Sequence, residues 1–325
     1  MFVCKALSWL LVALGSLAVV SLARGADDFP NKPVRIVVAY APGGGNDLFA
    51  RVLAKRLTET LGKTVLVDNR PGANGIIGTR LVAAATPDGY TVILADMAHA
   101  TNPFVYASAQ YEPIRDFAPI TMLGSAPIIL IVHPAAPLQS VGEFIAFAKN
   151  QPGKITMGSG GTGSTSHIAG EFFQMRTGVK LNHVPYKGTG PALADAVAGQ
   201  IQCIFSPVAA AIPLVTAGRL RALAISSAKR ASVVPDVPTF EEAGVTDFRV
   251  GGWYGILAPA GTPRPVVARL NQEFVAAVQS PEVRSRFDDA LVTPGTGTPE
   301  QFTAFLKSEA ARWSQLIKTV GISVD

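Results

Sequence analysis

The chain has 325 residues, of which 48% are hydrophobic, and its 28 Lys and Arg against 23 Asp and Glu give a formal net charge of +5 at pH 7. The basic residues are scattered, which argues against a nucleic-acid-binding surface and leaves a mild positive field that favours anionic ligands. This length exceeds the usual size of a single hydrophobic core, so we expect two lobes.

The first 25 residues have the pattern of a secretory signal peptide. Lys5 precedes an apolar run at 6–20, and small residues suited to cleavage follow it. The run is shorter than the ~20 residues that a membrane-spanning helix needs. We therefore expect export to the periplasm, with a mature N-terminus near 24–27. Removal of the signal peptide leaves Cys203 as the one cysteine, so we expect no internal disulfide.

Strands alternate with helices from residue 34 onward, which is typical of an α/β protein with mostly parallel sheets. In the first part of the chain we expect strands at 35–40, 65–68 and 91–95. A helix should begin at Asn46, whose side chain is suited to the N-cap, and another should span 75–85. These elements make one βαβ layer.

The series restarts at 128–132, after a Pro-bounded connection at 119–127. Further strands are expected at 155–157, 181–184, 201–205 and 221–226, and helices at 144–150, 164–177 and 192–198. A strand at 254–258 and helices at 265–279 and 299–320 then return the chain to the first lobe.

We thus expect lobe 1 at 26–124 plus 252–325 and lobe 2 at 125–251. The two chain crossings should form a hinge, with no single sheet running through both lobes.

Two glycine-rich loops each precede a predicted helix, one in each lobe. Residues 43–46 read GGGN, and residues 158–163 read GSGGTG, which fits the G-x-G-x-x-G pattern of dinucleotide sites. The next strand ends without an acidic residue for a ribose, and Ser164 stands where a phosphate-binding loop has Lys. We therefore expect no cofactor.

The same loops are suited to an anion. Backbone N–H groups, helix N-termini and the hydroxyls of Ser159, Thr162 and Ser164 could together bind a carboxylate. Glycines that only make tight turns are the alternative.

The candidate catalytic and metal-binding residues do not form a recognisable set. No G-x-S-x-G motif occurs, and His99, His133, His167 and His183 lack the spacing of a metal site. His167 near Ser164 could form a Ser/His pair, but a His at a helix start more often caps or packs. Cys203 lies on a predicted buried strand. We expect a binding protein and no metal, with an exported hydrolase or isomerase as the alternative.

Ordered blocks of residues carry a resemblance to a known family. They include PNKPVRIVV at 30–38, PGGGND at 42–47, DNRPGANG at 68–75, PDGYT at 87–91, HVPYKG at 183–188, PDVPT at 235–239, WYG at 253–255 and APAGTP at 258–263, together with the second glycine-rich loop. In these blocks the chain resembles the Bug proteins, the extracytoplasmic solute receptors of tripartite tricarboxylate transporters.

The resemblance implies an α/β, two-lobed periplasmic binding protein of type II, the Venus-flytrap kind. Such a receptor delivers a small organic carboxylate to a membrane permease, and we expect a monomer. In relatives the two glycine-rich loops hold one carboxylate, partly through bridging water. A sensory receptor that docks a signalling partner is the alternative.

The expected ligand-binding residues follow from the loops and the resemblance. They are Tyr40, Pro42, Gly43, Gly44, Asn46, Asn74, His99, Ser159, Gly160, Thr162, Gly163, Ser164, Tyr186, Lys187 and Ser206. Trp253 and Tyr254 could either line the cleft or belong to the core. Relatives often have an acid where this chain has Ser206, so a plain carboxylate is expected over an amino acid. Asp96 also departs from the small residues usual before His99.

Overall fold

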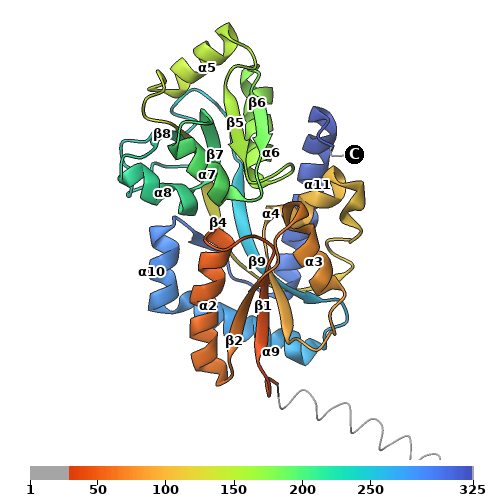
Figure 1. Cartoon of the computed structure of the whole chain (residues 1–325). Helices are drawn as coiled ribbons and strands as arrows, with labels where there is room; N and C mark the ends of the chain where they lie inside the picture. The colour runs from red at the N-terminus through yellow and green to blue at the C-terminus, as the bar shows by residue number, and fades with distance from the viewer. Residues whose placement is uncertain (1–28, 324–325) are drawn as a thin grey trace, which may run out of the picture.

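The computed structural model describes residues 29–323 and shows two α/β lobes, one above the other in Figure 1. The predicted signal peptide lies outside these residues. Lobe 1 starts with β1 (Val34–Val38), α2 (Gly45–Leu61), β2 (Val65–Asn69), the short 3-10 helix η1 (Ala73–Gly75), α3 (Ile76–Ala83), β3 (Thr91–Ala95), α4 (Met97–Val105) and the 3-10 helix η2 (Ala107–Ala109). The alternation of strand and helix expected from the sequence is confirmed here.

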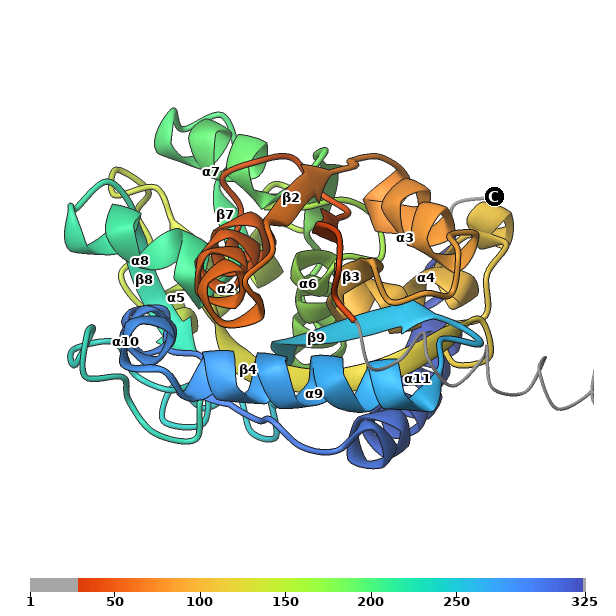
Figure 2. The same cartoon turned by 90° about the horizontal axis from the view of Figure 1, so that it is seen from below.

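The chain then enters and leaves the upper lobe on two long strands. The elements are β4 (Phe117–Val132), α5 (Val141–Asn150), β5 (Thr156–Ser159), α6 (Thr165–Thr177), β6 (Asn182–Pro185), α7 (Thr189–Val197), β7 (Cys203–Pro207), α8 (Val208–Thr216) and β8 (Arg221–Ile225). The return consists of β9 (Gly251–Pro259), α9 (Arg264–Gln279), α10 (Pro281–Asp289), β10 (Thr293–Pro294) and α11 (Pro299–Val320). Figure 2 shows α9 running along β4 and β9.

The strand β4 belongs to the sheets of both lobes. Its residues 117–127 pair with β9, and its residues 128–132 pair with β7 and β8. The hydrogen-bonded order β2-β1-β3-β9-β4-β7-β5-β6 therefore runs unbroken through both lobes. The expectation that no single sheet would run through both lobes is wrong. The argument for a hinge, which assumed two separate sheets, is therefore wrong as well.

Residues 119–127 resemble a connection in the sequence because of their prolines. Pro119 lies where the pairing of β4 with β9 shifts register, and Pro127 lies at the end of that ladder. Proline is tolerated in strands at bulges and ends, where its missing N–H breaks no regular ladder bond. Similarly, α4 and α8 were missed because each contains an internal proline, Pro103 and Pro213.

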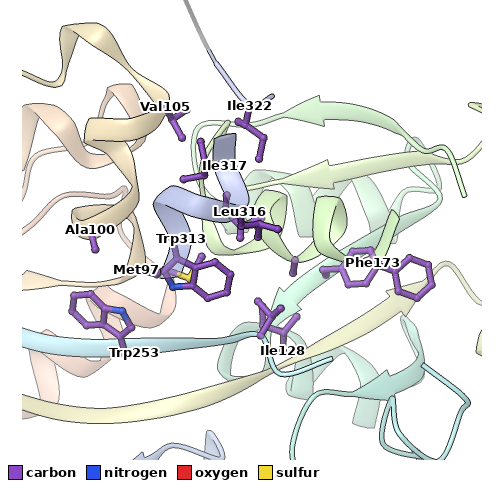
Figure 3. Close-up of a cluster of buried hydrophobic side chains, with 14 of the residues drawn as sticks. Met97, Ala100, Val105, Ile128, Phe173, Trp253, Trp313, Leu316, Ile317 and Ile322 are labelled. Carbon is purple, nitrogen blue, oxygen red and sulfur yellow. The ribbon is translucent and has the colours of Figure 1, made fainter. Parts of the chain in front are cut away.

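The C-terminal helix α11 packs against both lobes, whereas the sequence indicated only a return to lobe 1. Its Trp313, Leu316 and Ile317 join Met97 of lobe 1 and Phe173 of lobe 2 in one buried cluster, which Figure 3 shows. The predicted helix at 299–320 is confirmed, and its apolar side chains cover the back of the junction between the lobes. No helix among the described residues 29–323 is long and apolar enough to span a membrane.

Candidate functional site

A cavity of about 80 Å³ lies between the lobes. It is surrounded by the segments that follow the carboxyl ends of β1, β3, β5, β6 and β7, and by β9, which crosses between the lobes. Ligands of α/β proteins bind in this position because the loops at the carboxyl ends of parallel strands can vary without disturbing the sheet. At roughly 10–15 Å³ for each water, the cavity has room for several waters or a small organic molecule.

Four helices start at this cavity. Gly44 is the N-cap of α2, Thr165 is the first residue of α6, Gly188 is the N-cap of α7, and Pro207 is the N-cap of α8, and all four line the cavity. The first N–H groups of a helix have no acceptor within it, and the helix dipole makes that end partly positive. The backbone at these four helix starts is therefore suited to an anion.

The lobe-1 loop, residues 41–46, is held by the buried carboxylate of Asp47. That carboxylate accepts hydrogen bonds from the Gly43 N–H at 3.0 Å, Arg51 Nε at 2.9 Å and Asn69 Nδ2 at 3.0 Å. Burial alone would raise the pKa of Asp47, but the hydrogen bonds from Arg51, Gly43 and Asn69 outweigh it and lower the pKa below its ordinary value. The loop is thus fixed by a charged group just behind it.

Asn46 does not cap α2, which corrects the prediction. The helix begins at Gly45, its N-cap Gly44 makes no side-chain hydrogen bond, and Asn46 Nδ2 donates instead to Asp96 Oδ2 at 3.0 Å. The N-terminus of α2 is consequently left open toward the cavity.

The lobe-2 loop, residues 158–164, is held by a serine and two histidines. The Ser159 hydroxyl accepts from the Gly161 N–H at 3.1 Å and lies 2.6 Å from His183 Nε2. His183 stacks on His167 with ring centroids 3.8 Å apart, and His167 Nδ1 accepts from the Gly163 N–H at 3.0 Å. The Ser159 hydroxyl and the Gly163 N–H, which were expected to bind a ligand, therefore make contacts within the protein.

Seven of the fifteen expected ligand-binding residues line the cavity: Tyr40, Pro42, Gly44, Asn46, Gly160, Ser164 and Lys187. The other eight do not line it. Gly43, Ser159, Thr162 and Gly163 shape the two loops, and the Tyr186 hydroxyl donates to Asp195 Oδ2 at 2.7 Å. Ser206 is fully buried and donates to the Pro207 carbonyl.

Asn74 and His99 lie behind the cavity, beside a second, water-sized space of about 10 Å³. Asn74 Nδ2 donates to Asn102 Oδ1 at 2.9 Å, and His99 Nε2 lies 2.8 Å from the Pro113 carbonyl. Burial lowers the pKa of His99 to about 4, so its ring is neutral. Both residues support the wall of the site.

Sequence reasoning missed several lining residues. Asp96 follows β3, and Thr165, Ser166 and 188–191 extend the two segments already singled out. Trp253 and Tyr254, left open between core and cleft, are buried and also line the cavity. The available signal was positional, because each of these residues belongs to a strand that reaches the cavity or to the loop and helix start that come after one.

No triad or metal set occurs at this cavity. Residues 29–323 contain no group of three or more His, Cys, Asp or Glu side chains placed to hold a metal ion. Ser159 and His183 are in contact, but the Ser159 side chain is fully buried and does not line the cavity. Burial also raises the pKa of the Cys203 thiol, which keeps it in the unreactive protonated form.

Comparison with known proteins identifies the family. BugT of Bordetella pertussis is 36% identical over 298 residues, which cover 91% of each chain. A structure of an R. palustris protein with adipate is 36% identical, has a TM-score of 0.88 and covers 91% of this chain and 100% of the other. MatC from Rhodopseudomonas palustris with bound malate is 32% identical, has a TM-score of 0.85 and covers 89% and 100%. A family model described as tripartite tricarboxylate transporter family receptor matches residues 49–322, and the chain therefore belongs to this family.

Proposed function

We propose that this chain is a periplasmic receptor that binds a small organic carboxylate between its lobes and delivers it to the permease of a tripartite tricarboxylate transporter. The observation that carries the proposal is the convergence of the N-termini of α2, α6, α7 and α8 on one cavity, with the exposed Lys187 at its edge. Relatives solved with adipate and with malate support a carboxylate ligand.

The proposal includes capture without chemistry. The cavity presents donors for an anion, and the Ser/His contact beside it is buried away from any ligand. A receptor also needs release, so we expect no covalent step. Incubation with each bound carboxylate, followed by mass spectrometry of the small molecule, should return it unchanged.

The binding test is a thermal-shift screen against aliphatic and aromatic mono-, di- and tricarboxylates, followed by calorimetric titration of each hit. A ligand bound only by the native state raises the melting temperature. At a ligand concentration of 100 times its Kd, the free energy of unfolding rises by about 2.7 kcal/mol. Amides of the same acids are the matched controls, because they keep the shape and lose the charge. Equal shifts with acids and amides would contradict a carboxylate site.

The cellular part of the proposal rests on the signal peptide at 1–25 and on the family. The mature protein should be recovered from the periplasm as a monomer, starting near 24–27, with lobe 1 at 26–124 plus 252–325 and lobe 2 at 125–251. N-terminal sequencing of the periplasmic fraction checks the processing. Loss of uptake of the bound acid on deletion of the gene, with restoration by the intact chain, checks the transport role.

A further inference from the structure

Asp96 is an acidic side chain in the wall of a cavity otherwise suited to anions. It directly follows β3 and lines the cavity. Its Oδ1 accepts from the Tyr40 hydroxyl at 3.1 Å and from the Ala98 N–H at 3.0 Å, and its Oδ2 accepts from Asn46 Nδ2 at 3.0 Å. Among residues 29–323, no basic side chain is paired with it.

The hydrogen bonds fit the ionised form of this carboxyl group. All three neighbours act as donors, and the Ala98 contact makes Asp96 the N-cap of α4, where the helix dipole favours a negative charge. Burial raises the pKa of Asp96, and the three hydrogen bonds oppose that rise. Burial also raises the pKa of Tyr40, so its hydroxyl stays protonated and available to donate.

One acceptor position on Asp96 remains open. A carboxylate oxygen can accept two hydrogen bonds, and Oδ2 receives only the one from Asn46 among the contacts of the described residues. A buried carboxylate without a counter-charge is costly, so a cationic donor from a ligand would stabilise it. A second carboxylate placed there would be repelled instead.

The two sides of the cavity therefore carry different charged side chains. Lobe 2 offers Lys187 and the N-termini of α6, α7 and α8, which suit a carboxylate, while lobe 1 offers the carboxylate of Asp96 beside the N-terminus of α2. Ser206, whose place argued against an amino acid, is buried and does not line the cavity. The absence of an acid at position 206 therefore does not decide whether the ligand carries an ammonium group.

We propose that Asp96 is a specificity-determining residue that selects carboxylates bearing a protonated amine, so that the preferred ligand is a small amino acid. This inference rests on the proposed function, because it assumes that a carboxylate occupies the cavity. The Asp96 side chain would receive the ammonium group, while the helix N-termini of lobe 2 would receive the carboxylate.

Matched acids that differ in one substituent test the inference. Calorimetric titration would compare succinate, L-malate and L-aspartate, then glutarate with L-glutamate, and propionate with L-alanine. In the series that binds, we expect the amino acid to bind at least ~10-fold tighter than the unsubstituted acid, since a hydrogen bond to a charged group typically contributes that much. A tighter fit for the unsubstituted or hydroxy acid overturns the proposal.

The variant Asp96→Asn keeps the shape and removes the charge. It should lower the amino-acid preference by tenfold or more, through weaker binding of the amino acid and not of the plain acid. Asp88→Asn is the matched control, because Asp88 precedes β3 and Asp96 follows it, so that the five-residue strand, about 16 Å long, separates them. An unchanged preference in folded Asp96→Asn would overturn the proposal.

The outcomes also separate this inference from the proposed function. If plain and amino acids bind equally, the receptor function stands and the role of Asp96 falls. If no acid of the three series binds the wild-type protein, both fall. If Asp96→Asn does not fold, the order of the succinate, malate and aspartate affinities of the wild-type protein decides the question.

Discussion

The two glycine-rich loops face one cavity but are supported in different ways. Behind the lobe-1 loop lies the ionised Asp47, paired with Arg51. Behind the lobe-2 loop lie Ser159 and the stacked rings of His183 and His167, with Glu171 Oε1 3.4 Å from His167 Nε2. The lobe-1 loop thus depends on a carboxylate whose pKa is lowered, and the lobe-2 loop depends on the ring of His183, which burial keeps neutral. The two glycine-rich loops should therefore be destabilised by different changes, although their sequences are similar.

The glycines of the lobe-1 loop also differ from each other, and this difference leads to the largest expected effect. Gly44 has an ordinary φ of −82°, and a Cβ added to it would have no atom within 4 Å. Gly44→Val should therefore fold normally and fill part of the cavity. We expect a loss of affinity of ~100-fold or more for the tightest acid of the screen, since two or more backbone contacts of about 1.5–3 kcal/mol each would be blocked.

The matched control is the neighbouring Gly43→Val. Gly43 has a φ of +89° and does not line the cavity, so a β-branched residue would strain the backbone at a cost of about 1–3 kcal/mol. Gly43→Val should mainly lower the melting temperature, and Gly44→Val should mainly lower affinity. Titration and thermal unfolding of both variants check this split, and the reverse pattern would place the ligand elsewhere.

The lobe-2 loop should respond to a change in its support. Ser159→Ala removes the acceptor of the Gly161 N–H and the partner of His183, leaving buried polar groups unsatisfied. We expect a loss of about 1–3 kcal/mol in the free energy of unfolding, measured in urea. Thr162→Ala is the control, because Thr162 bonds Tyr106 through its carbonyl. A Ser159→Ala variant of native stability but tenfold weaker binding would instead restore Ser159 as a direct ligand.

Much of the fold and part of the site could be predicted from the sequence. Hydrophobic periodicity located β1, β3, α6 and α11 to within a few residues, since buried faces leave a regular pattern. The pattern failed at 117–127, where prolines and a glycine at register shifts hide a strand that pairs with β9. Long-range pairing is a tertiary property, and local sequence carries no signal for it.

The limits at the site have a similar cause. Glycine spacing identified both loops because close approach of a backbone requires glycine. It could not show that Ser159 turns toward His183, 24 residues later, or that Asn46 bonds Asp96, 50 residues later. Those contacts depend on how β5 lies beside β6 and how β1 lies beside β3.

The smallest expected effect is the pH dependence of the lobe-2 loop. Burial, together with the neighbouring His167, lowers the pKa of His183 to about 4, and Glu171 opposes the shift. The unfolded chain, with a His pKa of about 6.5, then binds more protons than the folded chain between pH 6.5 and 4. Stability should therefore fall as pH drops through this window. Allowing for the partly exposed ring, we expect His183 to contribute about 1–2 kcal/mol of that loss.

The variant His183→Gln tests this contribution, because Gln keeps a polar group near Ser159 and does not titrate. Its free energy of unfolding in urea should fall less steeply than that of the wild-type protein between pH 6.5 and 4. Asp47 has its pKa lowered from an ordinary value already below this window, so the lobe-1 loop should keep its support there. If the free energy of unfolding of variant and wild type depends on pH in the same way, His183 does not contribute to the loss of stability in acid. The two loops would then differ in composition alone.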